Sequence, residues 1–524
     1  MKKNSYASHS KSIFNPPQSE PIPGKKMVKN SAGGFVFQIS DIQRLERFLV
    51  LGSLSNTYYA SAKELTKDNV LTLVSLAQTN PHEYLATLLE FNKGNRIPKH
   101  SNLLYAYALL IAHSSIDTTS AFKLFVRNGS HILEMASCLK ALGVLNKKRV
   151  RALFGSWINA DTVSNDNILY QSAKYQNREG WTWKDLIRIV HPKANNAEKE
   201  YTLGVLVGKK EPKPETFLAY LQEAKTCSES RLIDLILNHS VSHEMIPSER
   251  ITKNVLAALA VKMPATALLR NLGRLGSHGL IDPLSEIGMA VSARLEQHDY
   301  FRESRVHPVQ VLLSLFVYKN GSGYRSKNTW TPNPRIVKSL EDLFYGSFGF
   351  IEQSDKRMLL ALDVSGSMSM GDVAQTPGLT PAIASAVMAM VQVRSCPNTL
   401  VMGFSDKFKD LKINATDSLE SAFRKTVNMN FGGTDCSLPF MYARKQALPV
   451  DGFVVYTDNE TWAGSSHPST ELKNYRKASG INAKSVVVGM TATQCSIADP
   501  NDPGMMDVCG FDTNVPQIIN QFFS

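Results

Sequence analysis

The sequence predicts a mainly helical protein with a C-terminal α/β domain, and two observations support this prediction. Helical apolar patterns recur from about residue 33 to about residue 350, with short breaks between them. Continuous apolar runs that end in polar residues then alternate with helical patterns up to residue 524. Residues 1–32 are polar and rich in Ser, Lys and Pro, so we expect this segment to be disordered or draped over the surface.

In the region 33–350, apolar residues recur at spacings of three and four, and Gly, Pro, Asn or Ser mark the breaks. More than a dozen such helices in series predict stacked helical pairs, as in a solenoid of the HEAT type. No single repeat period is visible, so an irregular all-helical domain stays open as the alternative. The clearest helical patterns are 41–52, 68–78, 82–93, 102–114, 131–143, 215–225, 254–262 and 308–319.

The region 351–524 has the pattern of a doubly wound parallel sheet. Fully apolar strands that alternate with helices are typical of a sheet covered on both faces. Binding sites in such sheets lie beyond the carboxyl ends of the strands. The predicted strands are 357–365, 398–405, 451–458 and 483–490, and the predicted helices between them are 381–394, 437–448 and 469–479.

The net charge of +12 is unevenly distributed along the chain. Residues 1–350 contain 44 Lys and Arg against 29 Asp and Glu, whereas residues 351–524 contain 14 against 17. The basic excess therefore lies in the helical region, where it would attract a polyanion such as nucleic acid or a lipid surface. A solvated basic surface that only aids solubility is the alternative.

The composition also predicts the compartment. The six cysteines form no CxxC pair, so the sequence does not support a zinc ribbon or thioredoxin-like chemistry. Sparse cysteine in a chain of this length fits a reducing compartment. The basic N-terminus lacks the apolar core of a signal peptide, and no apolar run approaches the ~18 residues that span a membrane. We therefore expect a cytoplasmic protein that does not enter a membrane.

Small oxygen ligands follow three of the predicted elements, in the motifs DxSxS, GGTD and TD. Because these elements end at the same edge of the sheet, we expect the motifs to meet at one point. The two glycines, Gly432 and Gly433, would let their loop approach closely. Carboxylate and hydroxyl oxygens suit Mg²⁺ or Mn²⁺ and do not suit zinc or copper. The candidate ligands are Asp363, Ser365, Ser367, Thr434 and Asp458.

These motifs, in this order, resemble the metal-ion-dependent adhesion site of von Willebrand factor A domains at all five positions. The resemblance implies a metal with one open coordination position, which an acidic residue of a protein partner fills. Polar strand ends that hold no metal are the alternative. Hydrolysis would need an activated water and a base or second metal, and only Asp406, Asp435 and Glu460 are near in sequence. We therefore expect no enzyme.

Long distinctive stretches extend the resemblance to nearly the whole chain. GGFVFQISDIQRLERFLVLGS at 33–53, KYQNREGWTWKDLIRIVHPK at 174–193 and HPVQVLLSL at 307–315 resemble the TROVE module of the Ro ribonucleoprotein autoantigen family. GGTDCSLP and TDNETWAG resemble the von Willebrand A domain that follows it in that family. The resemblance implies a ring of HEAT-like helices at 33–350 and a von Willebrand A domain at 351–524.

The same resemblance implies Y RNA, or a structured relative of it, bound on the basic helical module. It also implies that single-stranded 3′ ends of misfolded small non-coding RNAs enter the ring, for small RNA stability and RNA quality control. Three residues match positions that the family uses for Y RNA, two more lie on one helix face beside them, and two others share a later helix face. These candidates are, in that order, Lys174, Arg178 and His191; Lys184 and Arg188; and Arg270 and Arg274.

Two other functions stay open from the residues alone. One is a metal-dependent protein-adhesion module on a helical scaffold, with no RNA role. The other is a metal-dependent nuclease, which would lose RNA turnover when Asp363 is changed to Ala.

The family also implies an exoribonuclease partner such as polynucleotide phosphorylase in bacterial relatives, and a ring closed within one chain favours a monomer.

Overall fold

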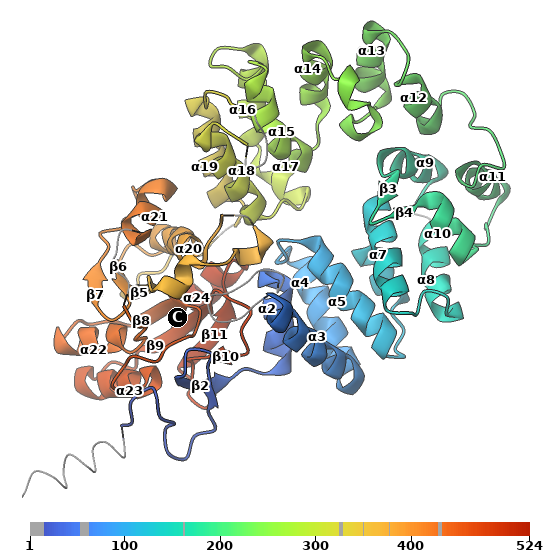
Figure 1. Ribbon diagram of the computed structural model, residues 1–524. Coiled ribbons are helices and arrows are strands. Elements are labelled where there is room, and N and C mark those ends of the chain that lie inside the picture. The colour runs from blue at the N-terminus through green and yellow to red at the C-terminus, as the bar shows by residue number, and fades with distance from the viewer. Residues whose placement is uncertain are drawn as a thin grey trace, which may run out of the picture. The chain divides into compact units, whose positions relative to one another are not determined.

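Two compact units make up the part of the chain that the computed structural model describes (Figure 1). The described residues are 15–52, 62–160, 163–323, 328–348, 351–376, 378–427 and 432–524. The sheet unit contains the described parts of Met1–Ser75, Gly94–Lys99 and Phe348–Ser524. The helical unit contains Leu76–Lys93 and the described parts of His100–Ser347. The expected boundary near residue 350 thus falls where the sheet unit resumes, but this unit also includes N-terminal residues that the sequence analysis assigns to the helical module.

Six strands form the central sheet of the sheet unit, in the order β11-β9-β8-β5-β6-β7. Five adjacent strands pair in parallel, and the edge strand β7 is antiparallel to its neighbour. This topology confirms the predicted doubly wound sheet. The apolar pattern did not predict β7, which is short, or β11, whose middle residues are only half-buried. The strands are β5 (Met358–Asp363), β6 (Thr399–Phe404), β7 (Phe408–Asp410), β8 (Gly452–Thr457), β9 (Lys484–Gly489) and β11 (Met505–Cys509).

Helices cover both faces of this sheet, as the two-sided burial of β8 requires. Phe453 and Val455 belong to one core cluster with Phe440 and Tyr475 of α22 and α23. The intervening Val454 is equally buried, and α20 contacts β8 and β5. The helices are α20 (Pro381–Ser395), α21 (Leu419–Val427), α22 (Leu438–Lys445), α23 (Pro468–Ser479) and α24 (Val515–Phe523), with the short 3₁₀ turns η3 (Gly366–Ser369) and η4 (Val373–Gln375) after β5.

Residues 15–52 are folded onto the sheet unit. β1 (Val28–Lys29) and β2 (Phe35–Gln38) form a small antiparallel sheet with β10 (Cys495–Ser496). Val36 of β2 enters the core cluster, and α2 (Asp41–Leu51) contacts β11. We expected residues 1–32 to be disordered or draped over the surface. From residue 15 onward the segment is instead folded against the sheet unit, and residues 1–14 lie outside the described part.

Buried ion pairs explain why this N-terminal part belongs to the sheet unit. Arg47 of α2 makes a bidentate ion pair with Asp507, with N–O distances of 2.7 and 2.8 Å. Arg96, which precedes α5 in the chain, pairs with Asp512, and both side chains are nearly inaccessible to solvent. Contacts between positions more than 400 residues apart leave no periodic signal in the sequence, so the pattern analysis could not place these residues.

The helical unit is built from short helices joined by short loops (Figure 1). All of the quoted helical patterns between 82 and 319 form helices, and side-chain N-caps begin many of them, for example Asn128, Ser164 and Thr252. The helices are α4 (Pro81–Lys93), α5 (His100–His113), α6 (Thr119–Phe125), α7 (Gly129–Ala141), α8 (Lys148–Ile158), α9 (Asn165–Lys174), α10 (Trp183–Val190), α11 (Ala197–Leu206), α12 (Phe217–Glu223), α13 (Glu229–His239), α14 (Lys253–Lys262), α15 (Ala265–Ser277), α16 (Glu286–Leu295), α17 (His298–Glu303), α18 (Pro308–Asn320) and α19 (Pro334–Gly346). The preceding helix α3 (Ala62–Thr79) begins in the sheet unit.

Neighbouring helices of this unit pair as in helical repeats, for example α4 with α5, α13 with α14 and α18 with α19. One contact joins its first helix to a late loop. Arg305, between α17 and α18, donates from Nη1 to the carbonyl oxygen of Asn92 in α4 at 2.7 Å. Two parts of the unit that are 213 residues apart therefore meet, as a ring-like arrangement of the helices requires.

Candidate functional site

The five predicted metal ligands lie at the carboxyl end of the central strands. Asp363 is the last residue of β5, Ser365 and Ser367 lie at the start of η3 and within it, Thr434 precedes α22, and Asp458 follows β8. All five are buried, and the most exposed of them retains only 5% of its accessible surface. All five candidates therefore lie at the carboxyl edge of the sheet, and their role as metal ligands stays a prediction.

Hydrogen bonds link four of these residues directly or through one neighbour. The Ser365 amide donates to Asp363 Oδ1 at 2.9 Å, and the Thr457 hydroxyl donates to Asp363 Oδ2 at 2.8 Å. The Ser365 and Ser367 hydroxyl oxygens are 3.1 Å apart, and the Ser367 hydroxyl bonds to the Asp458 carboxylate. Two carboxylates and two hydroxyls thus converge on one small volume.

The loop that carries Thr434 is tied to the loop after Asp458. The Thr434 carbonyl accepts hydrogen bonds from the amides of Trp462 and Ala463, each at 3.0 Å. A Cβ atom on Gly433 would lie 2.8 Å from the Cβ of Ala463, closer than two carbon atoms can approach. This confirms the prediction that a glycine at this position allows the close approach of the loop.

The electrostatics of the site favour a bound cation. Burial raises the pKa of the Asp363 carboxyl above its ordinary value, and the charge of Asp458 raises it further. Burial also raises the pKa of Asp458. Among the described residues, neither carboxylate forms an ion pair with Lys, Arg or His. Two buried carboxylates without a basic partner are costly unless a cation compensates them.

The donor set fits Mg²⁺ or Mn²⁺ in chemical type. Carboxylate and hydroxyl oxygens are hard ligands, and the remaining positions of an octahedron are commonly filled by water. In the part of the chain that the structure describes, no three His, Cys, Asp or Glu side chains gather as metal ligands. A thiolate or imidazole site for zinc is therefore absent from these residues.

The N-terminal segment holds the loops of the candidate metal centre, and the sequence analysis missed this. Gln18 is fully buried, and its Nε2 donates to Asp435 Oδ1 at 2.8 Å and to the Ser466 carbonyl at 2.9 Å. Its Oε1 accepts from the Gly464 amide at 3.2 Å and from the Thr461 hydroxyl. One amide side chain thus joins the GGTD loop to the loop after Asp458.

Two further residues of this segment contact the residues that follow Asp458. Asn30 Nδ2 donates to the carbonyl oxygens of Asn459 at 3.1 Å and Thr461 at 2.8 Å. The Ala32 amide donates to Glu460 Oε2 at 2.9 Å. Burial and the charge of Asp458 raise the pKa of Glu460 to about 7.

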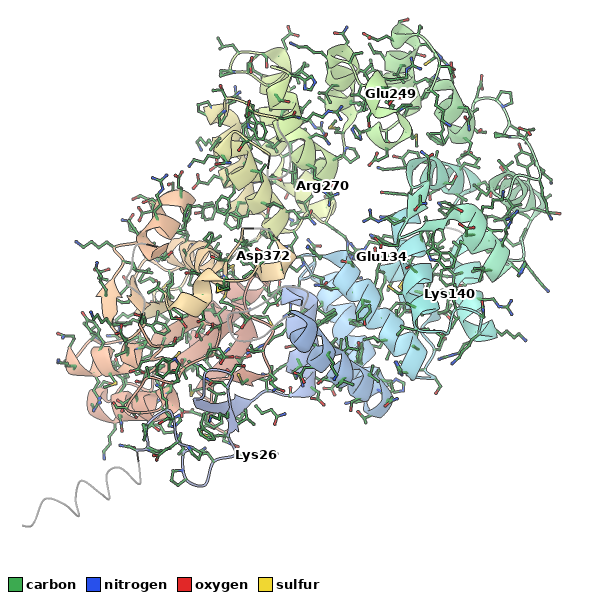
Figure 2. All side chains as sticks on the ribbon, viewed as in Figure 1. Lys26, Glu134, Lys140, Glu249, Arg270 and Asp372 are labelled. Atoms are coloured by element: carbon green, nitrogen blue, oxygen red, sulfur yellow. The ribbon has the colours of Figure 1, made fainter. Side chains whose placement is uncertain are left out.

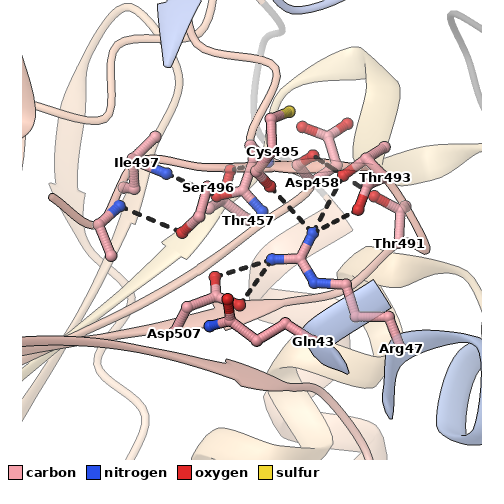
Figure 3. Close-up of polar contacts among 12 residues, drawn as sticks. Gln43, Arg47, Thr457, Asp458, Thr491, Thr493, Cys495, Ser496, Ile497 and Asp507 are labelled. Atoms are coloured by element: carbon pink, nitrogen blue, oxygen red, sulfur yellow. Dashed lines mark hydrogen bonds and ion pairs between the residues drawn. The ribbon is translucent and has the colours of Figure 1, made fainter. Parts of the chain in front are cut away.

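Arg47 holds a further loop beside the same site (Figure 3). Its Nη1 donates to the carbonyl oxygens of Thr493 at 2.7 Å and Cys495 at 2.9 Å, while Nη2 binds Asp507. The hydroxyls of Thr491 and Thr493 in turn reach the Asp458 carbonyl at 3.4 and 3.5 Å. Arg47 therefore fixes the loop that contacts the backbone of a candidate metal ligand.

The predicted RNA-binding residues of the segment 174–193 surround a short hairpin and the helix after it. Lys174 ends α9, where its ammonium lies over the rings of Tyr170 and Tyr175 at 5.7 and 5.6 Å. Arg178 is exposed on β3 (Asn177–Arg178), which pairs with β4 (Trp181–Thr182). The sequence analysis predicted no strands in this region.

Helix α10 presents the remaining residues of that segment. Lys184 and Arg188 are both exposed and one turn apart, as their spacing predicted. His191 caps the helix in the left-handed conformation, with φ of 49°, and is exposed. Trp183, on the opposite face, is 4% exposed and packs in the core.

Arg270 and Arg274 share helix α15 but differ in their surroundings. Arg270, labelled in Figure 2, is exposed. Arg274 is half-buried, and its Nη1 lies 2.7 Å from Nε2 of His243. The structure therefore leaves the Arg270 side chain free for a ligand and engages the Arg274 side chain within the protein.

The fold and the site define a class of protein: a helical TROVE module joined to a von Willebrand A domain. The TROVE domain family matches residues 222–316, and the Ro60 vWA domain family matches residues 357–523. "RNA-binding protein RO60" of Deinococcus radiodurans is 38% identical over 520 residues, which cover 97% of each chain. The protein of the same name from Caenorhabditis elegans is 30% identical and covers 94% of this chain and 90% of its own.

This chain belongs to the RO60 family. The crystal structure of the Deinococcus radiodurans RO (RSR) protein matches it with a TM-score of 0.69 and 37% identity, over 92% of this chain and 99% of that one. None of the helices within the described ranges has the length and apolar character needed to cross a membrane.

Proposed function

We propose that this chain is an RNA-binding protein that acts as a ribonucleoprotein. Its ligands are Y RNA or a Y-like structured RNA and the single-stranded 3′ ends of misfolded small non-coding RNAs, and its role is in small RNA stability and RNA quality control. The observation that carries the proposal is the exposed basic surface along β3 and α10 in a chain whose relatives bear the name RNA-binding protein RO60.

The chemistry of that surface supports RNA over other polyanions. Arg178, Lys184 and Arg188 are exposed, and none of them forms an ion pair with a described acidic residue. Free guanidinium and ammonium groups bind phosphates and release counterions, which makes the affinity salt-dependent. The exposed imidazole of His191 adds a group that can stack on a base or bond to it.

We further propose that the candidate metal centre binds Mg²⁺ or Mn²⁺ through Asp363, Ser365, Ser367, Thr434 and Asp458. The buried carboxylates without basic partners support this, since the metal would supply the missing positive charge. The metal, when bound, offers a Lewis-acidic position to a carboxylate. A protein partner with an acidic residue fits such a position.

We propose that the protein is not an enzyme, that it is cytoplasmic and monomeric, and that an exoribonuclease such as polynucleotide phosphorylase is a partner. The described residues around the candidate metal centre include no histidine or lysine paired with a nucleophile, which argues against hydrolysis.

The alternative function is a metal-dependent adhesion module without an RNA role. The indole of Trp462, 44% exposed beside the Thr434 loop, favours this alternative as an anchor for a protein partner.

A gel-shift titration tests the proposal. The probe is a stem RNA with a single-stranded 3′ tail, at 50 and 200 mM salt, with Mg²⁺ present. We expect tight binding that weakens at the higher salt, and a loss of roughly tenfold or more for Lys174→Ala with His191→Ala. Lys477→Ala, an exposed lysine of the sheet unit, is the control.

Two results would redirect the proposal. Equal affinity for the probe and for a random RNA, with no effect of the double variant, would favour the adhesion module. Shortened RNA in the gel, abolished by Asp363→Ala, would show a nuclease.

A further inference from the structure

Two arginine side chains from distant parts of the helical unit converge on one buried asparagine. Asn92 lies in the last turn of α4 and is 7% exposed. The Arg127 guanidinium donates to its side-chain oxygen, and Arg305 Nη1 donates to its carbonyl oxygen at 2.7 Å. Each arginine uses one donor group on Asn92, and each side chain is otherwise exposed. The remaining N–H groups of both forks are therefore available to a ligand.

The positive charge of this arginine pair is not balanced by an acidic group within the described part of the chain. Among the described residues, neither Arg127 nor Arg305 forms an ion pair with Asp or Glu. Partial desolvation of the guanidinium by neighbouring protein atoms and the charge of Arg305 lower the pKa of Arg127 to about 10, which reflects the electrostatic cost of the arrangement. The C-terminal dipole of α4 offsets part of this cost, because Arg305 caps a carbonyl of the last turn. A bound anion would offset the rest.

The backbone at Arg305 is also unusual. Its φ of 56° lies in the left-handed region, which costs a non-glycine residue of order 1 kcal/mol or more. The turn is closed by a hydrogen bond from the Arg305 amide to the Arg302 carbonyl at 2.9 Å. Such strain is retained where the surrounding structure holds it, and here it directs the guanidinium toward α4.

A neutral histidine pair lies beside the two arginines. The rings of His100 and His131 stack with their centroids 4.1 Å apart, and His131 Nδ1 accepts from the Arg127 amide at 3.3 Å. Burial and nearby positive charge lower the pKa of both histidines, to about 3 for His131. Arg178 contributes to this effect on His131, so the predicted RNA-binding surface approaches the same place.

We propose that Arg127 and Arg305 form a binding site for a phosphate group of the RNA backbone, and this deepens the proposed RNA-binding function on which it rests. Two guanidinium forks that are pre-oriented by Asn92 match the oxygens of a phosphate diester. Because Arg127 lies between α6 and α7 and Arg305 lies between α17 and α18, the phosphate bridges the contact between the early and late parts of the helical unit. RNA bound there therefore stabilises that contact by the same free energy with which the contact favours RNA.

Fluorescence anisotropy with a labelled 20-nucleotide single-stranded RNA, titrated at several salt concentrations, tests the site. The variants are Arg127→Gln, Arg305→Gln and the double change. Arg335→Gln removes an exposed arginine elsewhere in the helical unit and is the matched control. We expect the double variant to lose about tenfold or more in affinity and its salt slope to fall by about 0.7, because it loses the contact to one phosphate of a single strand. The control is expected to change affinity less than about threefold.

Two further measurements separate a loss of the phosphate site from unfolding and from the binding of free phosphate. Arg127→Lys and Arg305→Lys keep the positive charge but lose the paired N–H donors of the guanidinium. An intermediate RNA affinity of these variants supports the site even where a Gln variant unfolds. Inorganic phosphate at 10 mM is the second probe. If it protects the α4 amides from hydrogen exchange while the variants bind RNA as the wild type does, the ligand is free phosphate and the assignment to RNA is wrong.

Two other outcomes would contradict the phosphate site, and they differ in what they mean for the proposed function. Wild-type binding with unchanged affinity and salt slope in every variant would overturn the phosphate site while leaving the proposed function intact. A wild-type chain that binds neither this RNA nor the stem RNA would overturn the proposed function and the site together.

Discussion

The candidate metal centre and the basic surface of the helical unit are built in opposite ways. In the sheet unit, every candidate ligand is buried, and its loops are held by hydrogen bonds from Gln18, Asn30 and Arg47. In the helical unit, Arg178, Lys184 and Arg188 are exposed, and none of them forms an ion pair within the described ranges of the chain. A small ion needs oxygens at fixed positions, whereas a long polyanion is attracted by many adaptable charges. The predictions below test this contrast, beginning with the largest expected effect.

Breaking the buried support of the sheet unit has the largest expected effect. Arg47→Met leaves the carboxylate of Asp507, whose side chain is 6% exposed, without its partner. Removal of one member of a buried pair costs about 3–5 kcal/mol in the free energy of unfolding. Urea unfolding followed by circular dichroism measures this loss, with Lys477→Met as the control. A change below about 1 kcal/mol would show that this pair does not hold α2 on the sheet.

Metal binding is expected to stabilise the sheet unit without changing RNA affinity. Mg²⁺ at 100 times its dissociation constant adds about 2.7 kcal/mol to the free energy of unfolding, and EDTA removes it. Asp363→Ala should abolish this response in a thermal-shift titration and leave the stem RNA bound as before. If Mg²⁺ stabilises the variant as much as the wild type, the ion binds elsewhere. If the variant loses RNA affinity, the two sites are not independent.

Acid is expected to destabilise the helical unit through its histidine pair. Because His100 and His131 have lowered pKa values in the folded state, the unfolded chain binds more protons below pH 6.5. The free energy of unfolding is therefore retained above pH 6.5 and falls as the pH drops toward about 3. We expect each histidine to contribute roughly 1 kcal/mol per pH unit below pH 6, and the pair therefore about 2 kcal/mol per pH unit. His131→Gln should make the free energy of unfolding depend less steeply on pH, as measured by urea unfolding at pH 7.5, 6.0 and 5.0. If the pH dependence of the variant is as steep as that of the wild type, other groups cause the effect.

The smallest expected effect separates two arginines on one helix. Arg270 is free and Arg274 is engaged with His243, so Arg270→Gln should weaken RNA binding by about two- to fivefold and Arg274→Gln by less. Anisotropy with the single-stranded RNA measures both, and melting curves check for the stability that Arg274→Gln is expected to lose. Equal losses of affinity would show that the contact with His243 opens when RNA binds.

Local pattern was enough to predict most of the elements and the place of the candidate metal ligands in the fold. Spacings of three and four predicted the helices, and continuous apolar runs predicted β5, β6, β8 and β9, because both signals depend on neighbours in the chain. The order of the DxSxS, GGTD and TD motifs predicted which side chains lie together, since parallel strands end at a common edge. The shared helix face of Lys184 and Arg188 followed from their spacing of four residues.

Only the tertiary structure decided what supports these sites. Gln18 bonds to Asp435 across 417 positions, and Arg47 bonds to Asp507 across 460. Arg127 and Arg305 meet on Asn92 from separate parts of the helical unit. Such contacts carry no periodicity, and from the sequence alone a polar residue at each of these positions is expected to be exposed on the surface. The sequence by itself therefore determined the elements and the candidate ligands, while long-range packing determined which buried polar groups hold them in place.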